Sequence, residues 1–188
     1  MPGKPYKQVM KLIDHFLPDF QFNKIHEITV HASAPEVYTA IKELDMSNST
    51  MIRLLFRMRG LPATALTMKG SEEVGFVLLG EEPENELLLG LIGRFWKING
   101  EIHKSDEQTF VRFRKPGFAK AAWNFNVRQL KANKTELSTE TRIFCTDNSS
   151  YRKFRLYWFL IGPFSGLIRR KILSLIKKSA ERRVSVRF

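Results

Sequence analysis

The sequence predicts an α+β fold in which a curved antiparallel sheet wraps around one long C-terminal helix, with two short helices after the first strand. Three observations support this prediction. A strand-like segment at residues 25–31 is followed at once by helix-capping residues. Residues 74–145 then resemble a run of about six strands, joined by links too short for parallel pairing. Finally, residues 150–180 combine basic and apolar positions over a length that only a long helix explains.

The composition is that of one globular domain with a large aromatic core. The chain has 188 residues, of which 43% are hydrophobic and 12% aromatic. The single cysteine, Cys145, cannot form an intrachain disulfide, which fits a reducing and therefore cytoplasmic compartment. The four histidines are scattered and lack the spacing of a metal site. We therefore expect neither a metal nor a cofactor.

Residues 1–23 form an expected N-terminal arm, and residues 24–188 form the main domain. The arm carries apolar pairs at helical spacing, and Pro18 would end such a helix. It lacks the apolar run and cleavage site of a secretory signal. We expect a short amphipathic helix that packs on the domain. The alternative is a contact with a partner or a membrane.

The first helix after the opening strand has a clear start signal. Ser33 and Glu36 have the spacing of a capping box, and Pro35 occupies an early position where its missing N–H does no harm. A second short helix should follow, beginning at Ser49 or Thr50 and ending at Gly60 and Pro62. The predicted strands are residues 74–79, 86–92, 94–101, 109–114, 121–130 and 135–145. The acidic residues around the turn at 81–85 are expected to be solvated.

The last two predicted strands each have one face suited to the interior. Side chains alternate along a strand, so Trp123, Phe125 and Val127 share a face, and we assign it inward together with Thr139, Thr141 and Ile143. The opposite faces are polar, and Glu140 with Arg142 would form a surface ion pair of small value. A one-residue change of register would instead turn Glu140 and Arg142 inward as a polar anchor.

The segment EITVHASAPEVYTAIKEL, residues 27–44, resembles the START-like helix-grip superfamily, which includes polyketide cyclases, lipid-transfer domains and plant carriers of hydrophobic ligands. Residues 24–183 match its order of elements. The segments GFVLLGEEPENELLLGLIGRFW, PGFAKAAWNFNV, LSTETRIF and FRLYWFLIGPFSGLIRRKIL are similar to a bacterial branch without a settled activity. The resemblance implies a cavity between the sheet and the C-terminal helix.

The leading hypothesis is a noncatalytic carrier or sensor of a hydrophobic small molecule or lipid in that cavity. The expected lining residues are Met51, Leu54, Leu55, Phe76, Leu89, Phe113, Trp123, Phe125, Thr139, Thr141, Phe154, Trp158 and Ile161. Plain core packing is the alternative for Trp123 and Phe125. A second hypothesis is an enzyme of polyketide-cyclase type in the same cavity, with Glu140 or His31 as the acid or base to test first. No catalytic motif supports it.

The charge of the C-terminal segment raises a third hypothesis. Residues 150–188 contain eleven of the Lys and Arg residues and one Glu, so most of the net charge of +12 lies there. Residues 156–168 carry no charge, are too short to span a bilayer, and contain Pro163, where we expect a bend. The helix could contact an anionic membrane surface through Arg170, Lys171, Lys177 and Lys178, although packing on the sheet explains it equally. Nucleic acid is not an expected partner, because no recognition motif is present.

Overall fold

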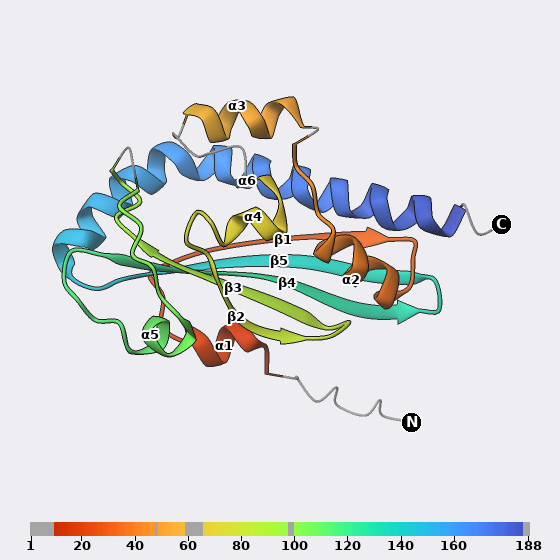
Figure 1. The fold of residues 1–188 in the computed structure, drawn as a ribbon, viewed down its shortest axis with the longest axis horizontal. Helices are drawn as coiled ribbons and strands as arrows, with labels where there is room; N and C mark the ends of the chain where they lie inside the picture. The colour runs from red at the N-terminus through yellow and green to blue at the C-terminus, as the bar shows by residue number, and fades with distance from the viewer. Residues whose placement is uncertain (1–9, 48, 59–65, 98–99, 186–188) are drawn as a thin grey trace, which may run out of the picture.

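The structure, a computed structural model, describes residues 10–47, 49–58, 66–97 and 100–185. Its centre is a curved antiparallel sheet of five strands in the order β1-β5-β4-β3-β2 (Figure 1). The strands are β1 (Phe22–Val30), β2 (Val77–Glu82), β3 (Glu86–Gly93), β4 (Ala119–Lys131) and β5 (Lys134–Cys145). The helices are α1 (Leu12–Phe16), α2 (Ala34–Lys42), α3 (Thr50–Met58), α4 (Met68–Ser71), α5 (Glu107–Arg112) and α6 (Asn148–Ser185).

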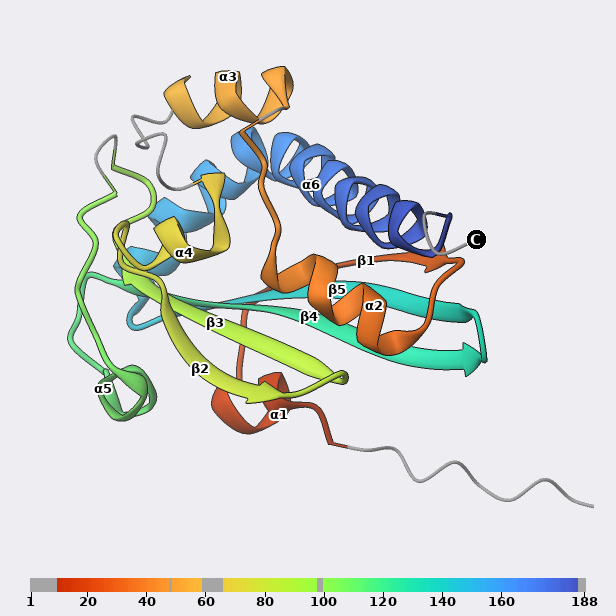
Figure 2. The same cartoon turned by 45° about the vertical axis from the view of Figure 1, so that its right-hand side comes forward.

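The long helix α6 lies along one face of the sheet, which we call the inner face. The opposite, outer face carries α1 and α5 (Figures 1 and 2). Helix α6 continues through Pro163, and Figure 1 shows its first half bending relative to the rest. This arrangement is the predicted helix-grip fold.

The start of α2 is confirmed at the level of single hydrogen bonds. The backbone N–H of Ser33 donates to the Glu36 carboxylate at 3.0 Å, which completes the predicted capping box. Helix α2 then buries Val37 and Ile41 against Ile172 of α6 in one apolar cluster. The predicted end of α3 at Gly60 and Pro62 lies outside the described residues.

The predicted inward face of β4 and β5 is confirmed. Phe125 and Val127 of β4 pack in the same apolar cluster as Ile172 and Ile176 of α6. Adjacent strands keep this face in phase, since Trp123 is paired with Thr141 across the β4–β5 ladder.

Two predicted strands are wrong. Residues 109–114 lie largely in α5, because the Asp106 carboxylate accepts the Thr109 N–H at 2.7 Å and starts a helix there. A short apolar run does not by itself distinguish a helix from a strand. In the other predicted strand, 94–101, the described residues 94–97, 100 and 101 are not in a strand, and the Arg94 N–H donates to the Gly100 carbonyl at 2.8 Å.

The outer face is also buried, which the sequence did not lead us to expect. Helices α1 and α5 cover it with an apolar cluster that includes Ile13, Phe16, Leu88, Phe110 and Phe113. The turn between β2 and β3 forms as predicted, but Glu86 beside it is only 2% exposed. Its carboxylate accepts the backbone N–H of Leu12 at 2.8 Å, and burial raises its pKa above the ordinary value.

Glu140 and Arg142 lie on this outer face, beneath α1. They are 4% and 8% exposed, so both the expected surface ion pair and the alternative inward anchor are wrong. Arg142 donates from Nε to Glu140 at 2.7 Å and from Nη2 to Asp14 of α1 at 2.6 Å. It also donates to the carbonyls of Ile13 and Leu17. The pair therefore holds the N-terminal helix on the sheet.

Lys120 of β4 provides a pH-dependent test of burial on the outer face. It is 2% exposed, its Nζ donates to the Val111 carbonyl at 3.2 Å, and burial lowers its pKa to about 8. Between about pH 8 and the ordinary lysine pKa, the unfolded chain binds more protons than the folded one, so stability should rise with pH across this window. We expect Lys120→Met to raise the free energy of unfolding at pH 7 by on the order of 2 kcal/mol.

Urea unfolding of wild type and Lys120→Met at several pH values would measure this difference, which should narrow as the pH approaches about 10.5. Lys131→Met is the matched control, because Lys131 lies on the same strand and is exposed. An equal, pH-independent effect of both changes would contradict the assigned burial.

Candidate functional site

The inner face holds two separate apolar clusters with polar side chains between them. One cluster surrounds Phe125 and Ile172, and the other surrounds Ile143 and Phe154. The polar side chains come from three strands and from α6, and we call them the central polar cluster. Its members are His26, Trp123, Thr139, Thr141, Ser165 and Arg169.

Arg169 carries the positive charge of this cluster. Its Nε donates to Thr141 Oγ1 at 2.8 Å, and its Nη1 donates to the Ser165 carbonyl at 3.2 Å and to the Ser165 hydroxyl. The guanidinium lies 6.0 Å from the centre of the Trp123 ring. An arginine is thus held between sheet and helix by neutral hydrogen-bonding groups and an aromatic ring.

Trp123 borders the cluster and is itself oriented by β5. Its Nε1 donates to Thr139 Oγ1 at 2.7 Å, and that hydroxyl donates to the Asn124 carbonyl at 2.6 Å. The Trp123 side chain is half-buried, and the centre of its ring lies 6.1 Å from that of the Phe76 ring. This indole is therefore fixed in orientation while part of its surface remains open.

His26 of β1 completes the cluster. Its Nε2 atom is buried and has no hydrogen-bond partner among the described residues. Burial lowers its pKa below the ordinary value, and the charges of Arg170, Arg169 and Lys24 lower it further. The imidazole is therefore neutral at pH 7. Gly166 of α6 faces it, and a Cβ built there would lie 3.5 Å from Nε2.

The predicted lining residues divide between several places. Trp123, Thr139 and Thr141 meet in the central polar cluster, while Leu89 and Phe125 pack on one side of it. Phe154 and Trp158 belong to the other apolar cluster, Phe76 contacts Trp123, and Ile161 is half-buried.

Four of the predicted lining residues lie elsewhere or are not described. Phe113 packs on the outer face against Phe118 and His103, so its assignment to the inner side is wrong. Met51 and Leu54 of α3 are exposed by 38% and 58%. The side chain of Leu55 lies outside the described residues.

Sequence reasoning missed His26, Ser165 and Arg169. A signal for His26 was present, because it alternates in phase with Ile28 and Val30, which face inward. Arg169 lies three residues before the buried Ile172, so helical spacing places it on the same face.

The two residues considered for acid–base chemistry are not at this site. Glu140 lies on the outer face with Arg142. His31 is exposed after the end of β1, and its backbone N–H donates to Glu181. Among the residues that the structure describes, no group of three His, Cys, Asp or Glu side chains could hold a metal ion. No helix of the described ranges is long and apolar enough to cross a membrane.

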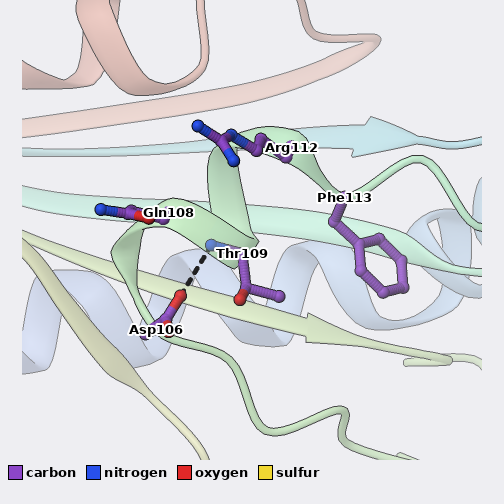
Figure 3. A pocket seen from close by; sticks show the side chains of 5 residues that line it. All are labelled: Asp106, Gln108, Thr109, Arg112 and Phe113. Atoms are coloured by element: carbon purple, nitrogen blue, oxygen red, sulfur yellow. Dashed lines mark hydrogen bonds between the residues drawn. The ribbon is translucent and has the colours of Figure 1, made fainter.

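A pocket of about 310 Å³ lies at α5, away from the central polar cluster. Its lining residues are Asp106, Gln108, Thr109, Arg112 and Phe113. Figure 3 shows the hydrogen bond from the Thr109 N–H to Asp106, with the ring of Phe113 turned away from it. The Asp106 carboxylate is already engaged in capping α5. Most of the other polar groups that line this pocket are exposed to solvent.

The fold is a helix grip, and the central polar cluster lies between its sheet and α6. The sequence matches no protein-family model and no curated protein. A conserved protein from Geobacillus kaustophilus is similar in structure, with a TM-score of 0.46, 11% identity, and coverage of 86% of this chain and 96% of that one. The fold assignment itself rests on the sheet and helix described above.

Two aromatase/cyclase structures are also similar. The Zhui aromatase/cyclase from a Streptomyces species has a TM-score of 0.33 and 15% identity, with 87% of this chain and 95% of that chain covered. The di-domain ARO/CYC BexL has a TM-score of 0.36 and 13% identity, with 86% of this chain and 47% of that chain covered.

Proposed function

We propose that the protein binds a hydrophobic small molecule or lipid between the inner face and α6, with the polar end of that molecule at the central polar cluster. The observation that carries this proposal is the buried Nε2 atom of His26, which has no hydrogen-bond partner among the described residues. A buried polar atom without a partner costs free energy. The polar group of a ligand would supply that partner.

The charges of the cluster favour a ligand with an acidic or carbonyl head. Arg169 donates charge-assisted hydrogen bonds, which are the stronger kind and suit a carboxylate or a polarised oxygen. A neutral imidazole at His26 can donate to or accept from the same head. The apolar clusters around Phe125 and Phe154 flank these groups and would contact the hydrophobic remainder.

Replacing Arg169 with Met should weaken the binding of a dansyl-labelled fatty acid by about tenfold or more, because the charge-assisted contact to the carboxylate is lost. Fluorescence titration measures the affinity. Lys178→Met is the matched control, since Lys178 is an exposed basic residue of the same helix about two and a half turns from Arg169. It should bind the probe as wild type does.

Two further results would decide the proposal. His26→Leu should also weaken binding while the thermal midpoint stays near that of wild type, because the change removes a polar atom that has no partner among the described side chains and backbone groups. Native mass spectrometry of freshly purified protein should show a co-purifying amphipathic molecule. A wild-type protein that binds no probe and carries no such molecule would contradict the proposal, as would equal losses in Arg169→Met and Lys178→Met.

A further inference from the structure

Helix α6 exposes a continuous row of large apolar side chains on the side away from the sheet. Its members, which we call the outer stripe, are Leu156, Phe159, Leu160, Phe164 and Leu167, and they are exposed by 67%, 79%, 59%, 49% and 48%. At about 100° per residue, these positions fall within an arc of about 140° on one helix face. The buried Phe154 and Ile172 lie on the opposite face. Core packing therefore does not explain the outer stripe.

Basic residues stand at both ends of the outer stripe, on the same helix face. Helical spacing places Arg152 and Lys153 about one turn before it, and Arg170 and Lys171 about one turn after it. None of the four forms an ion pair with a described residue. Between Asp147 and Glu181 the helix sequence contains no acidic residue. The row of apolar groups is thus flanked by positive charge only.

Helix α3 carries exposed side chains of the same kinds. It lies on the same side of the sheet as α6 in both views (Figures 1 and 2). Met51 and Leu54 are exposed by 38% and 58%, and Arg53 and Arg57 of the same helix are also exposed. Exposed apolar side chains next to basic ones thus occur on two helices of this side.

We propose that the outer stripe docks on an anionic lipid bilayer, with α6 lying in the plane of the interface. A helix with an apolar face between basic residues suits the boundary between acyl chains and headgroups, where the apolar side chains insert and the basic ones contact acidic lipids. The outer stripe extends over about 17 Å of helix, which is long enough to lie on a bilayer but too short to span it. Charge complementarity selects acidic lipid as the occupant.

The structure also corrects the earlier choice of basic residues. Lys177 was expected to point to an anionic surface, but its Nζ donates to the Thr29 carbonyl of β1 at 2.8 Å and lies 3.6 Å from Glu181. Lys178 is exposed, and Arg170 and Lys171 adjoin the outer stripe. The proposed docking does not depend on the ligand site, because Ser165 and Arg169 face the sheet from the other side of α6.

Flotation with lipid vesicles tests the apolar part of the proposal. Wild type should float with vesicles of phosphatidylcholine and phosphatidylglycerol and remain largely unbound with phosphatidylcholine alone. Changing Phe159, Leu160 and Phe164 together to Ser should reduce binding at least tenfold, with an unchanged thermal midpoint. Ile25→Ser with Leu130→Ser is the matched control, because both residues are exposed on the sheet, by 53% and 39%. It should bind as wild type does.

Charge reversal separates docking from general attraction by a basic protein. Arg152→Glu with Arg170→Glu should abolish flotation, whereas Lys131→Glu with Lys134→Glu, at the exposed β4–β5 turn, changes the net charge equally and should retain most of it. Equal losses in these two variants would overturn the proposal in favour of nonspecific attraction. Absence of vesicle binding by wild type would also overturn it, as would a dimer in sedimentation experiments that the triple Ser variant dissociates.

Discussion

Arg142→Met is expected to lower the free energy of unfolding by about 3–5 kcal/mol, because it leaves the buried Glu140 carboxylate without its positive partner. Glu140 is 4% exposed and accepts from Arg142 Nε at 2.7 Å. The change also removes the hydrogen bonds that Arg142 donates to Asp14 and to the Ile13 and Leu17 carbonyls of the N-terminal segment. Urea unfolding followed by circular dichroism would measure the loss.

An exposed ion pair on the same sheet supplies a matched control. Arg128 and Glu136 form a similar arginine–glutamate pair between β4 and β5, at 2.8 Å, but the Arg128 side chain is 59% exposed. Arg128→Met should therefore cost less than about 1 kcal/mol. A double variant, Arg142→Met with Glu140→Leu, should recover part of the lost stability, because it removes both buried charges. Equal losses for Arg142→Met and Arg128→Met would show that α1 does not cover the outer face.

Phe154→Ala is expected to lower the free energy of unfolding by about 3–5 kcal/mol through loss of buried area and creation of a cavity. Phe154 is 1% exposed, and its ring lies 5.0 Å from that of Phe22 and 5.6 Å from that of Trp158. It therefore connects α6 to the first strand of the sheet. Thermal and urea unfolding would measure the effect.

Phe159→Ala is the control on the same helix. Phe159 is 79% exposed, so its truncation should change stability by no more than about 0.5 kcal/mol. A loss like that of Phe154→Ala would mean that Phe159 is covered in solution. The two variants together test which side of α6 faces the sheet.

The order of elements was predictable because each relevant signal is local. The capping box at Ser33 and the alternation around Trp123 and Phe125 depend on residues close in sequence, and the structure confirms them. Local patterns failed at residues 109–114, where a short apolar run fits a strand and a helix equally. There the side chain of Asp106 decides, by capping α5.

The outer face shows a second limit. Alternation along β5 places Glu140 and Arg142 opposite Thr139 and Thr141, but it does not show whether another element covers that side. The cover, α1, comes from residues more than a hundred positions away, and Arg142 reaches Asp14 across 128 residues. For the same reason, the sequence patterns identified only part of the candidate site. Trp123, Thr139 and Thr141 share a strand face, whereas their contact with Arg169 depends on how α6 lies.

The distance in sequence between α1 and β5 also affects biosynthesis. Strand β1 leaves the ribosome before the other described strands, and among these its neighbour in the sheet is β5, with Phe22 paired with Ile143. Strand β1 therefore meets its partner only after about 105 further residues have been made, since Val30 is paired with Thr135. Pairings of such high contact order are slow to form, and unpaired apolar strands aggregate. We expect the nascent chain to depend on chaperones until β5 emerges and the sheet closes.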